Sequence, residues 1–307
     1  MGLLNQSPVL FRSSGDLIAD RRFTYACDYA AGGDFMAAAE LFEQAIARAP
    51  SWTAAWFALG AACEEAGSGE AALRAFARVT KLDPNDEFGA SLRLARLGAA
   101  TPAAAPCAYV KALFDQYAER FDKHLVDELA YRAPGLLAQT LAGLGRDDFA
   151  RCIDLGCGTG LCGSAFRDRV GYLTGVDLSP AAIEAARAKE IYDRLVVEDL
   201  NDFLSAEPEA SVDLLLAADA LVYIGDLSTV FAQARRALKL DGRFALTLQS
   251  GESGFAVGPD LRFAHAPDYV RELADSSNLA VAGLTQAALR REAGRDVLGL
   301  VVVLKPR

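Results

Sequence analysis

The sequence predicts an α/β protein in two parts: N-terminal α-helical repeats, followed by a doubly wound sheet of seven strands with the last strand antiparallel. Three observations predict this fold. Residues 19–86 repeat with a period of 34. An Ala- and Pro-rich segment follows at residues 99–106, and short apolar runs then alternate with helical patterns as far as the C-terminus. The length of 307 residues allows about two domains.

The helical repeats are predicted from two copies of one pattern. The second copy has Trp, Leu-Gly, Ala, Phe and Pro at Trp56, Leu59, Gly60, Ala72, Phe76 and Pro84. The first has Tyr29, Ala38, Phe42, Ala45 and Pro50, with Arg22 in place of the Trp. Small residues let paired helices approach closely and each Pro ends its second helix. The pattern resembles tetratricopeptide (TPR) repeats, and residues 87–98 are expected to add a capping helix.

The composition limits the kinds of partner. Hydrophobic residues make up 52% and charged residues 23% of the chain, which is typical of a folded protein. The net charge of −10 repels nucleic acid and anionic membrane surfaces, so neither is expected as a partner. The longest apolar stretch, Leu298–Leu304, is far shorter than the roughly 20 residues of a membrane span.

Cysteine usage and the N-terminal residues indicate the compartment. The start MGLLNQSPVLF has no basic segment followed by a continuous apolar run, so no secretion signal is predicted. The six cysteines form no C-x-x-C pair, and only two histidines are available. We therefore expect a cytoplasmic protein with reduced thiols and no metal site.

The repeat domain is expected at residues 1–98, a linker at 99–106 and the second domain at 107–307. Within the second domain, aromatic and leucine residues recur every four positions from Tyr109 to Leu129, which predicts a long amphipathic helix. We expect strands near 150–155, 172–177, 194–198, 212–218, 243–249, 279–286 and 297–304, and helices near 160–169, 179–190, 226–239 and 267–276.

Two features at neighbouring strand ends indicate a nucleoside site. The first strand runs into Gly156-Cys157-Gly158-Thr159-Gly160, where glycines permit a tight turn and close approach of a ligand to backbone N–H groups. The second strand ends at Asp177, whose carboxylate can accept hydrogen bonds from both ribose hydroxyls.

The glycine turn leaves open which nucleoside binds, because residues 158–163 match the G-x-G-x-x-G of dinucleotide-binding enzymes. Asp154, at the mouth of the turn, distinguishes a dinucleotide from a nucleoside that carries a methionine moiety. A carboxylate there repels a pyrophosphate and attracts the ammonium group of a methionine moiety. This favours S-adenosylmethionine (SAM) over NAD.

The segment Ile153–Gly160 together with Asp177 resembles motif I and its partner acid in class I SAM-dependent methyltransferases, which have a Rossmann-like sheet. The resemblance covers most of residues 107–307. It implies that the glycine turn and Asp154 hold the methionine part and that Asp177, followed by Leu178, holds the ribose. It also implies that Asp199 and Leu200 contact the adenine and that the methyl-transfer centre lies along Ala218, Asp219 and the residues after them.

Residues 114–125, with Tyr131 and Pro134, resemble the bacterial subgroup that joins TPR repeats to this domain. In related enzymes the preceding helix closes over the cofactor, so Tyr117 is expected to contact it. Asp219 and His265 are the candidate catalytic residues, for orienting or deprotonating a nucleophile. A loop-capping role for Asp219, and a capping or surface role for His265, are the alternatives.

The chemistry expected is in-line methyl transfer to an N, O, S or C nucleophile. No Asn/Asp-Pro-Pro-Tyr/Phe sequence follows the fourth strand, which disfavours adenine and amide nitrogens. The acceptor is then a small molecule or a protein side chain. The TPR module is expected to bind a partner, mediate self-association or pack on the second domain. An NAD-dependent oxidoreductase and a non-catalytic TPR scaffold are the alternative functions.

Overall fold

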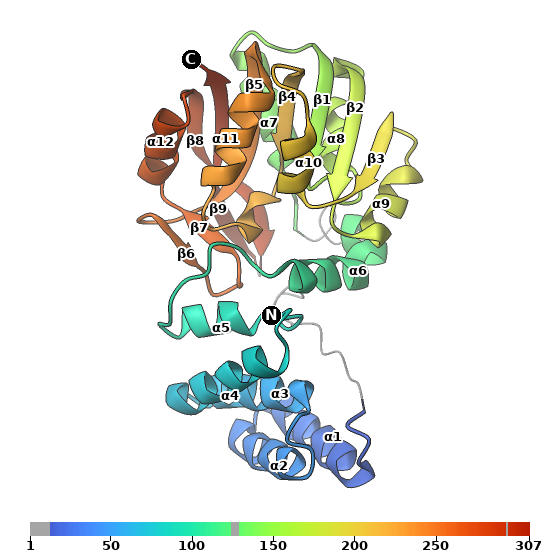
Figure 1. The fold of residues 1–307 in the computed structure, drawn as a ribbon, viewed down its shortest axis with the longest axis vertical. Coiled ribbons are helices and arrows are strands. Elements are labelled where there is room, and N and C mark those ends of the chain that lie inside the picture. The colour runs from blue at the N-terminus through green and yellow to red at the C-terminus, as the bar shows by residue number, and fades with distance from the viewer. Residues whose placement is uncertain (1–12, 124–128, 293) are drawn as a thin grey trace. The chain divides into compact units, whose positions relative to one another are not determined.

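The computed structural model describes residues 13–123, 129–292 and 294–307, and their side chains except those of 117–123 and 292. It divides into two compact units, one ending at Tyr109 and the other comprising Val110–Arg307 (Figure 1). Each unit has its own hydrophobic core. The division falls within a helix that begins at Cys107, just after the Ala- and Pro-rich segment, and residues 99–106 contain no helix.

The N-terminal unit is a row of helices, each packed against the next in sequence. They are α1 (Leu17–Ala31), α2 (Phe35–Arg48), α3 (Thr53–Glu65), α4 (Gly69–Leu82) and α5 (Ala90–Arg96). Close packing needs Gly60 of α3, because a Cβ there would lie 2.6 Å from the ring of Phe76 on α4. Phe57 packs on that ring with centroids 5.5 Å apart. The predicted helix pairs are confirmed, and α5 occupies the place of the predicted capping helix.

The second unit is built on one mixed sheet. Its strands are β1 (Phe149–Leu155), β2 (Val170–Asp177), β3 (Arg194–Val197), β4 (Val212–Ala217), β5 (Leu238–Ser250), β6 (Phe255–Val257), β7 (Phe263–His265), β8 (Leu279–Glu292) and β9 (Arg295–Pro306). The long strands lie in the order β3-β2-β1-β4-β5-β9-β8. β1 to β5 are mutually parallel, and β9 runs antiparallel to both of its neighbours.

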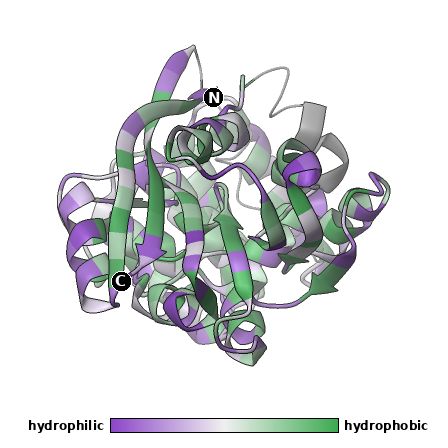
Figure 2. Ribbon diagram, turned by 90° about the horizontal axis from the view of Figure 1, so that it is seen from above, coloured by the Kyte–Doolittle hydropathy of each residue, from purple (hydrophilic) through white to green (hydrophobic). Residues whose placement is uncertain are grey.

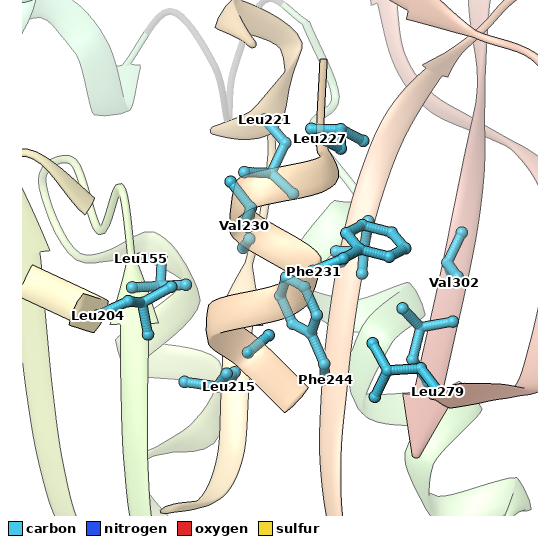
Figure 3. Packing of buried hydrophobic residues seen from close by; sticks show 14 of the residues in the cluster. Leu155, Leu204, Leu215, Leu221, Leu227, Val230, Phe231, Phe244, Leu279 and Val302 are labelled. Atoms are coloured by element: carbon cyan, nitrogen blue, oxygen red, sulfur yellow. The ribbon is translucent and has the colours of Figure 1, made fainter. Parts of the chain in front are cut away.

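Helices cover both faces of this sheet. They are α7 (Ala133–Gly143), α8 (Leu161–Phe166), α9 (Pro180–Arg187), α10 (Leu200–Ala206), α11 (Ser228–Ala237) and α12 (Pro267–Ser276). Helix α6 (Cys107–Lys123) precedes them in the chain and contains the division between the two units. One core lies between the sheet and α10, α11 and α12, where Phe231 packs edge-on against Phe244 of β5 (Figure 3). The other hydrophobic core lies between the sheet and helices α7 and α8. Long stretches of the strands are coloured as hydrophobic in Figure 2, and all six residues of β4 are buried, as expected for a strand covered on both faces.

The predicted doubly wound sheet with an antiparallel strand at its C-terminal end is therefore confirmed, with two corrections. Among the described residues the sheet has nine strands rather than seven, because the short β6 and β7 add to the carboxyl end of β5. Three-residue strands carry no periodicity that the sequence could reveal. The predicted long helix does not extend to Leu129, which is not helical; the structure describes helix α6 over Cys107–Lys123. Among the described residues, no helix is long and apolar enough to cross a membrane.

Candidate active site

The glycine turn lies at the carboxyl end of β1, the central strand of the parallel part of the sheet. Gly156, Gly158 and Gly160 all have positive φ, at +65°, +53° and +94°, which side chains rarely tolerate. A Cβ on Gly156 would also lie 2.4 Å from the Cβ of Ala220. The glycines thus bend the chain sharply, and the loop after β4 lies directly against the turn.

Asp177, the last residue of β2, links the glycine turn to the start of helix α9 by hydrogen bonds. Its Oδ2 accepts a hydrogen bond from the backbone N–H of Gly158 at 2.9 Å, and its Oδ1 accepts one from that of Ser179, also at 2.9 Å. Burial raises the pKa of the carboxyl group, while both amides favour the charged form. A carboxylate has about four acceptor positions, so these two bonds leave capacity for ligand hydroxyls.

Asp154 is buried at the end of β1, with only 1% of its surface exposed. Its Oδ2 accepts a hydrogen bond from the Tyr192 hydroxyl at 2.7 Å, and its Oδ1 has no hydrogen-bond partner among the described residues. Burial raises the pKa of Asp154 to about 7; the charge of Asp177 adds to this, and the Tyr192 hydroxyl and Gly163 amide oppose it. A cationic ligand group at Oδ1 would donate the missing hydrogen bond to this oxygen and would neutralise the buried negative charge of Asp154.

Tyr192 is a site residue that sequence reasoning did not find. It follows α9 and lies under the glycine turn. Three glycines leave room for its ring: a Cβ would lie 3.0 Å from the ring at Gly160, 2.9 Å at Gly175 and 2.3 Å from the hydroxyl at Gly163. The only signal in the sequence was this set of glycines, since the contact joins residues 38 positions apart.

The other predicted cofactor residues lie around the same strand ends. Cys157 and Thr159 are buried within the turn, and the Cys157 sulfur lies against Gly175 of β2. Asp199 caps α10, accepting a hydrogen bond from the backbone N–H of Asn201 at 2.8 Å. The three remaining predicted residues are half-buried: Leu178, Leu200 and Ala218. Their contacts with a cofactor stay predictions.

The side chain of Tyr117 lies outside the described residues, so its predicted contact also stays a prediction. Helix α6, which carries it, is tied to the cofactor side of the sheet by another residue. Ser179, at the start of α9, donates a hydrogen bond to Asp115 of α6 at 2.6 Å. Lys111 forms an ion pair with the same carboxylate and, with Ser179, lowers its pKa against the effect of burial.

Asp219 lies in the loop that touches the glycine turn. Its φ of +58° is in the left-handed region, and its backbone N–H donates to the Thr247 hydroxyl of β5 at 2.9 Å. One carboxylate oxygen, Oδ2, faces Arg290 at 3.4 Å and Arg262 at 3.8 Å. The other, Oδ1, has no hydrogen-bond partner among the described residues. Oδ1 of Asp219 is therefore left unsatisfied by the described residues, and both its contact with a ligand and its catalytic role stay predictions.

His265 lies in a different environment from the one expected. Its side chain is fully buried, Nε2 lies 3.0 Å from the Gly225 carbonyl, and the ring stacks on Tyr269 with centroids 5.8 Å apart. Burial lowers its pKa to about 4. Both alternatives to the catalytic role are wrong, because His265 is not at the surface and Ala266 occupies the capping position of α12. The geometry favours a packing role, and the catalytic role stays a prediction.

Comparison with known families agrees with this arrangement. Residues 153–246 match the model of a methyltransferase domain, and residues 24–87 match that of the tetratricopeptide repeat. The trans-aconitate 2-methyltransferase of Enterobacter sp. (strain 638) is 34% identical over 113 residues, which cover 36% of this chain and 44% of that protein. The chain thus spans less than half the length of this curated relative.

Solved structures share the fold. A putative methyltransferase in complex with the Haloferax volcanii activator Trm112 superimposes with a TM-score of 0.51 at 22% identity, covering 63% of this chain and 98% of that one. The Burkholderia thailandensis 1,6-didemethyltoxoflavin-N1-methyltransferase, solved with bound 1,6-didemethyltoxoflavin and S-adenosylhomocysteine, superimposes with a TM-score of 0.51 at 20% identity, covering 67% of this chain and 92% of that one.

The strand order and the mixed sheet agree with the methyltransferase fold of these solved structures. The chain contains a segment that matches a methyltransferase domain, preceded by a segment that matches tetratricopeptide repeats.

Proposed function

We propose that the protein is a SAM-dependent methyltransferase acting on a small molecule or a protein side chain. The observation that carries this proposal is the buried Asp154 carboxylate at the glycine turn, with Oδ1 lacking a partner among the described residues. A cofactor with an ammonium group supplies the missing partner, whereas a pyrophosphate does not. The residues present therefore fit SAM, which supplies a methyl group already activated on a sulfonium.

Each residue of the site has a proposed role. Asp154 holds the methionine ammonium, and the backbone N–H groups of the glycine turn face the remainder of the amino-acid part. Asp177 accepts the ribose hydroxyls while keeping the turn in place through Gly158. Asp199 and Leu200 flank the adenine. With the donor and acceptor aligned, positioning alone is worth up to roughly 7–11 kcal/mol, so a dedicated base is not essential.

Calorimetric titration with SAM and with NADH tests the proposal. We expect the protein to bind SAM and S-adenosylhomocysteine and to show no binding of NADH at the same concentrations. NADH binding without SAM binding would establish the oxidoreductase alternative instead. Absence of binding by either ligand to a folded protein would favour the non-catalytic scaffold.

The acceptor is proposed on two grounds. The acidic net charge of −10 disfavours nucleic acid. The trans-aconitate relative is named for a small-molecule substrate, which supports a small-molecule acceptor here. Incorporation of labelled methyl groups from SAM into cell extracts separated by size distinguishes a small molecule from a protein.

The repeats are proposed to bind a partner protein or to mediate self-association, in a cytoplasmic enzyme. Support comes from the tetratricopeptide match and from exposed aromatic side chains on α1, Tyr25 and Tyr29. Light scattering on the full chain measures self-association, and a monomer would leave partner binding as the proposal.

A further inference from the structure

A cluster of four charged residues lies beside the glycine turn and is not explained by cofactor binding. It consists of Asp219 after β4, Asp260 and Arg262 in the loop between β6 and β7, and Arg290 on β8. Arg290 faces Asp219 Oδ2 at 3.4 Å and Asp260 Oδ2 at 3.5 Å, and Arg262 faces Asp219 Oδ2 at 3.8 Å. We call these four residues the arginine cluster.

The two guanidinium groups are enclosed to a degree unusual for arginine. The side chain of Arg290 is 1% exposed and that of Arg262 is 8% exposed. Burying charge is costly unless close pairing offsets it. The pair distances of 3.4–3.8 Å exceed the roughly 2.7–2.9 Å of charge-assisted hydrogen bonds. The enclosure of two guanidinium groups therefore carries a desolvation cost for the fold.

Local distortions of the backbone place both arginines. The β8–β9 register shifts between Ala288 and Arg290, forming a bulge that leaves Leu289 and Arg290 both buried instead of alternating. Bulges commonly redirect a side chain beside an active site. In the loop between β6 and β7, which carries Arg262, Leu261 has a φ of +60°, a value that a branched side chain disfavours. Such strain is concentrated at functional sites.

The arginine cluster lies where an acceptor must approach. Ala220, next to Asp219, touches the glycine turn at Gly156. Residues 129–132 dock on the bulge through backbone hydrogen bonds, from Arg132 N–H to Leu289 O at 2.8 Å and from Arg291 N–H to Leu129 O at 2.6 Å. Tyr131 in this segment is close enough to both Asp154 and Asp219 for each to raise its pKa, after burial.

We infer that Arg262 and Arg290 form an anion subsite for the methyl acceptor, and that the acceptor is a small molecule carrying a carboxylate. This inference rests on the proposed function. Two guanidinium groups and two carboxylates leave the arginine cluster without net charge, so the sulfonium of bound SAM makes the site favourable for an anion. A carboxylate matches the planar fork of a guanidinium group, and its small size suits donors this deeply enclosed.

The test works on a mixture, so the acceptor need not be identified first. A small-molecule cell extract is divided by anion exchange into anionic and non-anionic fractions, and each is incubated with the full chain and methyl-labelled SAM. We expect label in the anionic fraction only. Capping carboxylates in that fraction with carbodiimide and methylamine should abolish labelling, whereas phosphatase should not. Label in the non-anionic fraction or in protein, or loss of labelling with phosphatase alone, overturns the inference.

Variants connect this result to the two arginines. Arg290→Lys and Arg262→Gln should lower labelling at least tenfold while S-adenosylhomocysteine binds with unchanged Kd. Arg271→Gln, which changes an exposed arginine of α12, is the matched control and should label normally. Unchanged labelling by the folded Arg290→Lys and Arg262→Gln variants overturns the inference and leaves the proposed function intact. Failure of the wild type to bind S-adenosylhomocysteine refutes the proposed function itself.

Discussion

The affinity for SAM should depend on pH through Asp154. Burial raises the pKa of this carboxyl group to about 7 in the free protein. The ammonium group of the cofactor binds only the ionised form. As the pH falls through the pKa of Asp154, binding must therefore first remove a proton, and the affinity declines.

The size of the effect follows from the pKa. If only ionised Asp154 binds, the apparent Kd is multiplied by one plus the ratio of protonated to ionised carboxyl. With a pKa of about 7, the Kd at pH 5.5 should be about 25-fold weaker than at pH 7.5. Below pH 6 the slope should approach tenfold per pH unit. Calorimetric titration with SAM across this range measures it.

Two controls isolate Asp154 from other titrating groups. The Asp154→Asn variant should bind SAM more weakly and should lack the roughly 25-fold pH dependence, even though Asp177 still titrates. 5′-Methylthioadenosine lacks the amino-acid part, so its binding to the wild type should not follow the Asp154 titration. A Kd for SAM that is the same at pH 5.5 and 7.5 in the wild type would refute the reasoning.

Three further substitutions test the site and the repeats. Asp177→Ala should weaken SAM binding at least tenfold by calorimetry, since a hydrogen bond to a charged group is worth about 1.5–3 kcal/mol. Gly163→Ala places a Cβ 2.3 Å from the Tyr192 hydroxyl, so loss of its bond to the buried carboxylate should lower the free energy of unfolding by about 1.5–3 kcal/mol, measured in urea. Gly60→Ala meets the buried Phe76 ring and should destabilise the helical unit by about 1–2 kcal/mol, measured by helix unfolding.

Each of these three substitutions has a matched control. Gly69→Ala on α4 and Gly143→Ala on α7 place a Cβ in open space and should leave the unfolding free energy nearly unchanged or slightly raised. Asp268→Ala removes an exposed carboxylate and should not alter SAM binding. If Gly60→Ala behaved like Gly69→Ala, the close packing of α3 on α4 would not be what requires glycine there.

The sequence predicted the parallel core well because that core is repetitive. The strands β1 to β4 are short, mostly apolar runs bounded by turns, and their predicted limits fall within two residues of the observed ones. The glycine turn and Asp177 were found because they follow those strands directly. Wherever structure depends on local periodicity, one sequence is enough to predict it.

The parts that were missed depend on contacts distant in the chain. Arg290 lies beyond the predicted strand 279–286, and it turns inward only because a bulge interrupts β8. Tyr192 lies between a helix and a strand with no periodic neighbours, and its role depends on three glycines elsewhere. Neither residue carries a pattern of its own, so only the assembled fold reveals it.

The structure also changes the reason for expecting SAM rather than NAD. A fully charged Asp154 would repel a pyrophosphate at any pH, but with a pKa of about 7 the buried carboxyl can become neutral at little cost near neutral pH. Repulsion alone is then a modest barrier to NADH, and selectivity comes mainly from the ammonium group that ionised Asp154 attracts. The preference for SAM over NADH should consequently narrow as the pH falls from 7.5 to 5.5. Titrations with SAM and, at higher concentrations, with NADH measure this preference at each pH, and a preference that widened at low pH would show that Asp154 does not govern the selection.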